Sequence, residues 1–376
     1  MGNLAALFQL DPGVAFLNHG SYGACPRVVF EAYQGFQREL ERQPVAFLDP
    51  ARGWSDRLAM VRAVVAAEIG AEARDLVGVR NATEALNIVA QSLDLAPGDE
   101  VLMSDHEYGA MEKLWEWVCR CRGARVVVAE VPLPLVDAEA FTQAMIWAMT
   151  ARTRVVFLSQ VTSATALVLP IAAVVAEARA RGIWTVIDGA HGPGLVGLDM
   201  AELGADFYAG NGHKWWMAPK GAGFLWARRE CQGVLRPLVI SHFAERGFPE
   251  AFEMQGTRDP AAWLALPEAL RFRREQGWQR VAADCGGMAR QVAEWVAERS
   301  GLAALSSAAF AAGQMVALPV PECDVGALKL YLEGLGVEVP CYRWRGHCIV
   351  RLSVQGYNSA ADLVRLQVGL AGFFGW

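Results

Sequence analysis

The sequence predicts an α/β protein in which helices cover both faces of a mostly parallel sheet, followed by a smaller α+β region. Short apolar runs typical of strands alternate with helical periodicity between residues 54 and 227. The runs at 155–158 and 183–187 are almost wholly apolar, as expected for strands buried on both faces. Near residue 259 the pattern changes to a long helical stretch and then to shorter strands.

The N-terminal part contains two helices and two segments that end in turns. A strand that breaks into a glycine turn is predicted at 16–23, and apolar residues three and four apart predict helices at 26–42 and 54–69. A strand at 76–79 then leads into a helix start at 80–87. This helix start is a candidate phosphate site, because a helix N-terminus presents free amides and a positive dipole end. Simple capping by Asn81 or Thr83 is the alternative.

The remaining elements alternate regularly up to residue 227. Helices are predicted at 111–121, 138–149 and 170–181, and further strands at 100–103, 124–131, 155–158, 183–187 and 223–227. Polar side chains follow several of these strands, as in Ser104-Asp105-His106-Glu107-Tyr108. Open α/β sheets bind ligands at the carboxyl ends of their strands, so we expect the site there.

The C-terminal part is predicted to be α+β. A long helix is expected from 260 to about 299, shorter strands at 315–320 and 348–354, and helices near 325–335 and 360–374. We therefore divide the chain into an N-terminal segment at 1–20 that packs near the small domain, a large domain at 21–259 and a small domain at 260–376.

The composition favours a cytoplasmic enzyme. The 376 residues are 53% hydrophobic and carry a formal charge of −6 without a Lys/Arg run, which argues against a nucleic-acid partner. No stretch approaches the roughly 18 apolar residues of a membrane span, and the first ten residues lack a basic secretion-signal region. The eight cysteines have no metal-ligand spacing, so we expect reduced thiols and no metal site.

Lys214 and Asp188 form the pair around which the sequence is organised. Asp188 ends the apolar strand at 183–187, and Lys214 ends a glycine-rich turn that begins at Ala209. Pyridoxal phosphate enzymes need a lysine that forms a Schiff base with the aldehyde, and an acid that keeps the pyridine nitrogen protonated. We therefore expect pyridoxal 5′-phosphate as the cofactor.

Several motifs in this order resemble the class V aminotransferase family, fold type I of the pyridoxal phosphate enzymes, and in particular its isopenicillin N epimerase-like branch. The motifs are Leu17-Asn18-His19-Gly20-Ser21-Tyr22-Gly23, Arg80-Asn81-Ala82-Thr83-Glu84-Ala85-Leu86-Asn87, Asp105-His106-Glu107-Tyr108-Gly109-Ala110, Asp188-Gly189-Ala190-His191-Gly192-Pro193-Gly194, Gly212-His213-Lys214-Trp215 and Arg351-Leu352-Ser353. The resemblance covers nearly the whole chain. It implies a seven-stranded sheet and a homodimer with shared active sites.

The resemblance also implies roles for cofactor-binding residues. Lys214 resembles the Schiff-base lysine and general base, Asp188 the pyridinium partner, and His191 the donor to the ring hydroxyl oxygen. Ala82 and Thr83 would hold the phosphate, together with Asn211 and His213.

Other positions carry alternatives. Tyr108 resembles the residue that stacks on the pyridine ring, with His106 as its rival. Thr162 or Ser163 would touch the cofactor edge, and Thr257 would reach the phosphate of the partner subunit. The substrate-binding residues would be Arg351, as the clamp on the substrate carboxylate, and Asn18 and His19, at the substrate mouth. The alternative for Arg351 is a salt bridge within the small domain.

The implied reaction is labilisation of a bond at the α carbon of an amino acid. Epimerisation is the first expectation, with a second acid/base, His19 or Tyr108, opposite Lys214. The alternative is β-elimination by a carbon–sulfur lyase. Transamination and cysteine desulfuration are further alternatives, although neither Cys341 nor Cys348 lies in a recognisable catalytic-loop motif. A non-catalytic binding protein of the same fold is the alternative from another class. A dinucleotide enzyme is disfavoured, since no Gly-x-Gly-x-x-Gly follows a strand.

Overall fold

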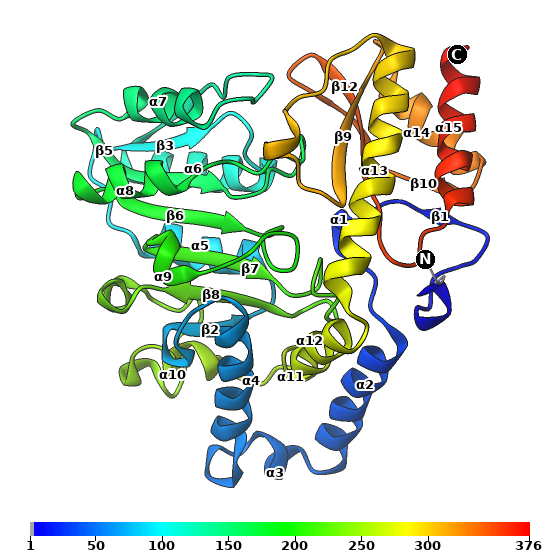
Figure 1. Ribbon diagram of the computed structural model, residues 1–376. Coiled ribbons are helices and arrows are strands. Elements are labelled where there is room, and N and C mark those ends of the chain that lie inside the picture. Colours follow the sequence, from blue (N-terminus) through cyan, green and yellow to red (C-terminus); the bar gives the residue numbers. More distant parts are fainter. Residues whose placement is uncertain (1–3) are drawn as a thin grey trace.

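A computed structural model describes residues 4–376, and its centre is a seven-stranded sheet in the order β2-β8-β7-β6-β5-β3-β4 (Figure 1). Only β8 runs antiparallel to its neighbours, so the sheet is mostly parallel, as predicted. The strands are β2 (Leu76–Val79), β3 (Glu100–Ser104), β4 (Arg125–Ala129), β5 (Thr153–Ser159), β6 (Trp184–Gly189), β7 (Phe207–Asn211) and β8 (Gly223–Ala227).

Helices cover both faces of this sheet, and successive residues of each strand point to opposite faces. On β5, Val156 and Leu158 join one apolar cluster, whereas Val155 and Phe157 join the other. The first cluster includes residues of α2 (Arg27–Arg42), α4 (Trp54–Glu68), α7 (Ala138–Ala148) and α8 (Ala172–Ala180). The second includes residues of α5 (Ala82–Ser92), α6 (Gly109–Arg122) and α10 (Glu250–Glu253). Short helices α3 (Pro44–Leu48) and α9 (Met200–Leu203) complete this part.

Two predicted segments differ in detail. The strand expected near residue 16 is only β1 (Ala15–Phe16), and the following glycine turn forms the one-turn helix α1 (His19–Tyr22). The glycine-rich turn before Lys214 begins later than expected, because residues 209–211 belong to β7. Gly210 packs so closely on Phe224 that a Cβ atom would clash, which explains a glycine inside this strand.

The long helix expected at 260–299 is three helices, which corrects the prediction. They are α11 (Ala261–Leu264), α12 (Leu266–Glu275) and α13 (Trp278–Ser300). Pro267 lies in the first turn of α12, where its missing N–H is tolerated. Gly277 has φ 58°, a left-handed conformation that separates α12 from α13. As a result α11 and α12 contact α2 and α4, whereas α13 contacts β9 of the small sheet.

The C-terminal part contains the three-stranded antiparallel sheet β11-β12-β9, formed by β9 (Met315–Val320), β11 (Cys341–Trp344) and β12 (His347–Ser353). Its helices are α13, α14 (Val325–Gly334) and α15 (Ala360–Phe374). The N-terminal strand β1 pairs in parallel with β10 (Val337–Glu338), so an early segment of the chain lies beside the small domain (Figure 1). The exact domain boundaries at 20/21 and 259/260 stay predictions.

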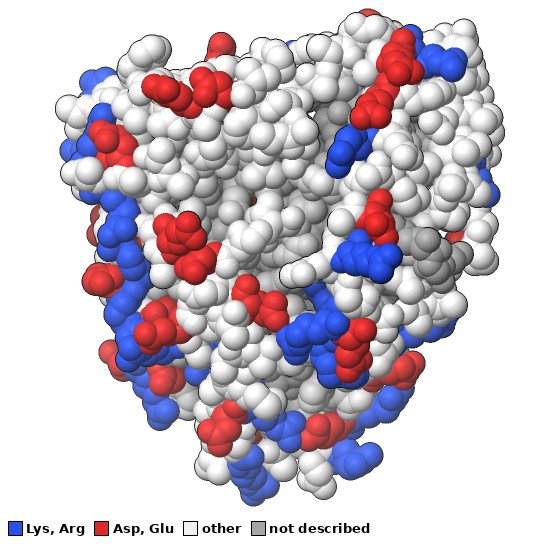
Figure 2. Space-filling view, viewed as in Figure 1, with Lys and Arg blue, Asp and Glu red and all other residues white. Residues whose placement is uncertain are grey.

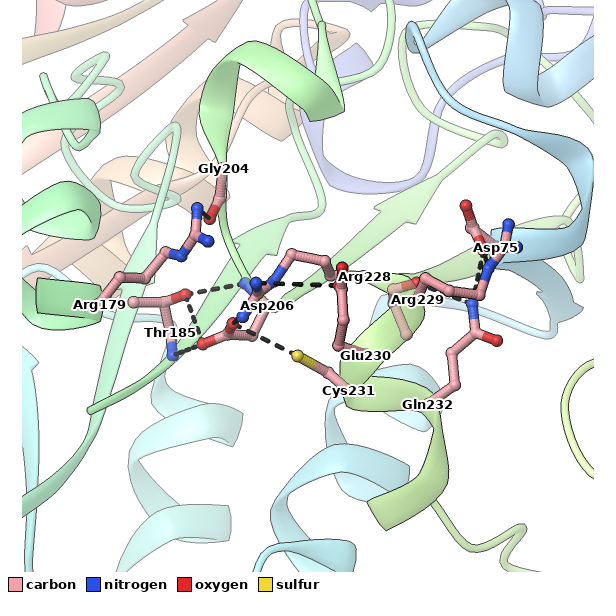
Figure 3. Close-up of polar contacts among 11 residues, drawn as sticks. Asp75, Arg179, Thr185, Gly204, Asp206, Arg228, Arg229, Glu230, Cys231 and Gln232 are labelled. Atoms are coloured by element: carbon pink, nitrogen blue, oxygen red, sulfur yellow. Dashed lines mark hydrogen bonds and ion pairs between the residues drawn. The ribbon is translucent and has the colours of Figure 1, made fainter. Parts of the chain in front are cut away.

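A polar cluster ties together the strand ends that lie away from the cofactor motifs (Figure 3). The buried carboxylate of Asp206 accepts hydrogen bonds from the Thr185 amide and hydroxyl, from the Arg228 guanidinium and from Cys231 Sγ. Thr185 lies near the start of β6, Asp206 precedes β7, and Arg228 follows the antiparallel β8. The cluster therefore fixes the register of three neighbouring strands.

The charged side chains on the face shown in Figure 2 are of both signs and interspersed. Within residues 4–376, no helix is long and apolar enough to cross a membrane. Over the same residues, no group of three or more His, Cys, Asp or Glu side chains is arranged to hold a metal ion.

Candidate active site

A cavity of about 480 Å³ lies at the carboxyl ends of the parallel strands, within the size range of small-molecule sites. Ten of the thirteen predicted site residues line it: Ala82, Thr83, Tyr108, Ser163, Asp188, His191, Asn211, His213, Lys214 and Arg351. The first nine come from the strand-and-helix part of the chain, whereas Arg351 comes from β12. The cavity therefore joins the two predicted domains.

Lys214 is a buried amine beside a histidine. Its Nζ lies 3.0 Å from His191 Nε2, and Trp215 Nε1 donates a 3.2 Å hydrogen bond to His191 Nδ1. Burial, reinforced by the nearby charge of Arg351, lowers the pKa of Lys214 from 10.5 to about 7. Burial and the Lys214 charge also lower the pKa of His191 well below 6.5. A lysine amine with such a pKa is available as a nucleophile and as a base near neutral pH.

Asp188 is a buried carboxylate without a cationic partner. It is the penultimate residue of β6, it is 5% exposed, and Oδ1 accepts a 2.8 Å hydrogen bond from the Ala190 amide. No Lys, Arg or His nitrogen of residues 4–376 forms an ion pair with it. Burial raises the pKa of Asp188, partly offset by the Ala190 amide and by Lys214. A cationic ligand atom placed against this carboxylate would remove that penalty.

The start of α5 offers donors to an anion, although not all of those expected. The Asn81 side chain caps the helix by accepting from the Glu84 amide, and the Ala82 amide donates to Asn211 Oδ1 at 2.8 Å. The role of the Ala82 amide in phosphate binding stays a prediction, because this amide is bonded to Asn211 here. Among the described residues, the Thr83 amide and hydroxyl form no hydrogen bond, and buried His213 Nδ1 has none either. These groups remain available.

Arg351 is almost fully buried and has no acidic partner. Its Nη1 donates to the Ser163 carbonyl at 2.7 Å and its Nη2 to Ser21 Oγ at 2.8 Å. Its buried Nε has no partner, and no carboxylate within residues 4–376 pairs with it. The alternative of a salt bridge within the small domain is therefore wrong. A buried guanidinium held only by neutral oxygens suits a carboxylate ligand.

For two predicted positions the sequence left a choice between two residues, and in each case only one of them lines the cavity. Tyr108 lines the cavity, whereas His106 is fully buried behind it, with Nδ1 2.6 Å from Thr165 Oγ1 and its ring against Trp344. Ser163 lines the cavity, whereas Thr162 is buried and bonded to the Leu167 amide and Thr165. The stacking role of Tyr108 stays a prediction.

Three predicted residues do not line the cavity. His19 lies behind the lysine turn: Ala24 N donates to its Nδ1, and its Nε2 donates to the Lys214 carbonyl at 2.9 Å. Burial lowers the pKa of His19 to about 3. Asn18 accepts from Ser21 Oγ and donates to Glu338. The placement of both at the substrate mouth is therefore corrected. Thr257 is exposed outside the cavity of its own chain, and its contact with a partner subunit stays a prediction.

Sequence reasoning missed several residues near the cavity. Ser21 holds Arg351, and Tyr342, Lys220 and Arg80 line the wall. Ser21 and Arg80 stood inside quoted motifs without a role, whereas no sequence signal pointed to Tyr342. No cysteine lines this cavity, and burial raises the pKa of Cys341 to about 12, which disfavours a thiolate there.

These observations fit pyridoxal phosphate. An unpaired buried carboxylate suits its ring nitrogen, the free amide and hydroxyl of Thr83 suit its phosphate, and the easily deprotonated Lys214 suits its aldehyde. Gly23 also contributes, since it has φ 69° and a Cβ there would lie 1.9 Å from the His213 carbonyl. This contact brings α1, and with it Ser21, next to the lysine turn.

The chain was compared with known proteins. The family model "Aminotransferase class-V" matches residues 18–366. Isopenicillin N epimerase of Streptomyces clavuligerus is 36% identical over 97% of this chain and 96% of its own length. L-cysteine desulfhydrase of Arabidopsis thaliana is 30% identical over 94% of this chain and 87% of its own length. In structure, the cysteine desulfurase CsdA from Escherichia coli superposes with a TM-score of 0.83 at 22% identity, covering 99% of this chain and 98% of that chain.

Proposed function

Because the chain belongs to the class V aminotransferase family and uses pyridoxal 5′-phosphate, we propose that it is an epimerase, which removes the α-proton of an amino acid from one face while a group on the other face supplies a proton. The main support is that one cavity holds a lysine whose pKa is lowered to about 7 and a buried arginine without an acidic partner among the described residues. The isopenicillin N epimerases at 36% identity support the outcome at the α carbon.

The residues divide the work. Arg351 binds the substrate carboxylate through its free N–H groups and is oriented by Ser163 and Ser21. Lys214 removes the α-proton, because its pKa of about 7 leaves much of it unprotonated at neutral pH. Asp188 holds the ring nitrogen, and the cofactor, when bound, supplies an electron sink. Thr83 and His213 hold the phosphate.

A second candidate is β-elimination from a sulfur-substituted cysteine. One observation favours it: epimerisation needs an acid/base group opposite Lys214, and His19, one of the two groups expected there, is buried behind the lysine turn. The tyrosine side chains of Tyr22, Tyr108 and Tyr342 line the cavity, and Tyr108 is the other expected group. Elimination needs only Lys214. The desulfhydrases at 30% identity and above support this alternative.

The test incubates the cofactor-loaded protein with D- and L-amino acids and with S-substituted cysteines in D₂O. Deuterium at the α carbon with inversion supports epimerisation, whereas pyruvate release supports elimination. Lys214→Ala should abolish both, a loss of at least about 10³-fold. The matched control is Lys113→Ala, an exposed lysine on α6. Failure of every amino acid to exchange its α-proton would reject both candidates.

We also propose that the active unit is a cytoplasmic homodimer in which Thr257 contacts the phosphate bound to the partner subunit. Its exposed position outside the cavity of its own chain leaves it free for that contact, and all eight cysteines are unpaired thiols. Light scattering should give twice the chain mass, and Thr257→Ala should weaken cofactor binding. A monomer with full cofactor affinity would contradict the proposal.

A further inference from the structure

Trp215 follows Lys214 and makes a hydrogen bond that the catalytic roles above do not use. Its side chain is fully buried, and its Nε1 donates to His191 Nδ1 at 3.2 Å. The other ring nitrogen, His191 Nε2, lies 3.0 Å from Lys214 Nζ, and both residues line the cavity. His191 thus stands between a buried indole and the reactive amine.

The chemistry of the indole restricts this histidine to one form. A tryptophan Nε1 is only a donor, so His191 Nδ1 must present its lone pair. A neutral imidazole then carries its single hydrogen on Nε2, the nitrogen nearest Lys214. Burial keeps His191 neutral, since it lowers the pKa well below 6.5. Nε2–H can bond only to a lone pair, which an uncharged Lys214 supplies and a lysinium does not.

We propose that Trp215 is a positioning residue that fixes the tautomer of His191, so that Nε2–H always faces the cavity and favours the uncharged form of Lys214. The inference rests on the cofactor site alone and holds for either proposed reaction. When the cofactor is bound, the same Nε2–H remains the donor available to an oxygen of its ring, as the family resemblance assigns to His191.

The first test needs neither cofactor nor substrate. In apo-protein labelled with ¹⁵N-histidine, long-range ¹⁵N–¹H correlation spectra distinguish the two tautomers. The wild type should show His191 as the Nε2–H form alone, assigned by the loss of its signals in His191→Gln. An Nδ1–H form of His191 in the wild type would overturn the proposal.

The second test uses Trp215→Phe, which removes the donor and keeps an aromatic ring. His191 should then populate the Nδ1–H form and accept from a lysinium, so the pKa of Lys214 should rise. The reaction of Lys214 with added pyridoxal phosphate, followed against pH, should move its midpoint upward by about one unit, or about tenfold in rate below the midpoint. An unchanged midpoint and tautomer would overturn the proposal.

The matched control is Trp278→Phe. Trp278 is equally buried, at 2% exposed, but its Nε1 has no hydrogen-bond partner among residues 4–376. The change therefore removes comparable core volume without a donor. It should leave both the His191 tautomer and the Lys214 midpoint unchanged. If Trp278→Phe shifted the Lys214 midpoint as much as Trp215→Phe, the shift would come from weakened core packing. It would then not support a role for the Trp215 hydrogen bond.

Discussion

Two buried aspartates near opposite ends of neighbouring strands have contrasting surroundings. Asp206 precedes β7 and is surrounded by donors from Thr185, Arg228 and Cys231 (Figure 3). Asp188 lies at the carboxyl end of β6 and receives a hydrogen bond from the Ala190 amide but no ion pair among the described residues. Both are 5% exposed or less. Two aspartates of similar burial thus differ in their partners. Asp206 has a complete set of hydrogen-bond donors, whereas Asp188 has an incomplete set.

The contrast separates stability from function. A charge that is satisfied within the fold supports the folded state, whereas a buried charge without partners costs stability until a ligand completes it. Arg351 belongs to the second kind, since its Nε is unpartnered. The carboxyl ends of the strands therefore hold charges kept ready for a cofactor and substrate.

The largest effect is expected for a substitution of Asp188, the aspartate that lacks an ion-pair partner. Asp188→Asn should lower kcat/KM by about 10²–10³-fold, because the ring nitrogen loses its anionic partner. Apo-protein stability should not fall. Burial raises the pKa of Asp188, so its ionised form is less stable in the folded chain than in the unfolded chain, and the neutral amide removes that cost. Steady-state kinetics and urea unfolding of the apo-protein measure both. A marked loss of apo stability would break the comparison.

Arg351→Met should raise KM for amino-acid substrates, because the substrate carboxylate loses its charged partner. The increase should correspond to a loss of about 2–4 kcal/mol of binding free energy. The apo-protein should be as stable as the wild type or more stable, since an uncompensated buried charge disappears. Substrate titrations and unfolding curves give the two quantities. An exposed matched control is Arg343→Met, whose ion pair with Glu322 lies on the surface. Equal effects of the two changes would argue against the role of Arg351.

Asp206→Asn is the same substitution at the aspartate whose hydrogen-bond partners are complete. Unlike Asp188→Asn, it should lower stability and leave activity unchanged. It leaves the Arg228 guanidinium, 30% exposed, with only the longer 3.8 Å ion pair to the exposed Glu230. The free energy of unfolding should fall by about 2–3 kcal/mol. At a temperature where the variant stays folded, kcat/KM should match the wild type. A loss of activity per folded molecule would show that the two ends of the sheet are not independent.

The smallest effect is a pH dependence of apo stability. The pKa of Lys214 falls from 10.5 to about 7 on folding, so between these values the folded chain binds fewer protons than the unfolded chain. Stability from this residue therefore rises with pH across that window. Relative to Lys214→Met, the wild type should gain about 1 kcal/mol between pH 7.5 and 8.5. A flat difference in unfolding free energy would show that Lys214 is charged in the folded protein.

Local patterns predicted most elements and the central pair of the site. The strands and helices between residues 76 and 227 follow short-range periodicity, so their bounds agree within a few residues. Lys214 and Asp188 were found because each follows a strand, and carboxyl ends of parallel strands share one edge. The division of the stretch after residue 260 into three helices could also have been predicted, since Pro267 and Gly277 are residue types that interrupt helices.

The remaining contacts depend on residues distant in sequence. The amide of Ala82 is taken by Asn211, and the buried place of His19 depends on Tyr357 and Lys214. Ser21 becomes important only because Arg351, 330 positions later, points at it. A turn motif shows that its side chains are polar, but not which of them face the ligand and which hold the residues that do.

The pairing of β1 with β10 has a consequence for biosynthesis. Phe16 aligns with Glu338, so this ladder joins segments that leave the ribosome far apart in time. At typical elongation rates of about 5–20 residues per second, the nascent β1 waits roughly 16–64 seconds for its neighbour. Meanwhile the α/β part can already be complete. The amino-terminal strand is thus among the first to be made and among the last to dock, leaving chaperones time to act on it.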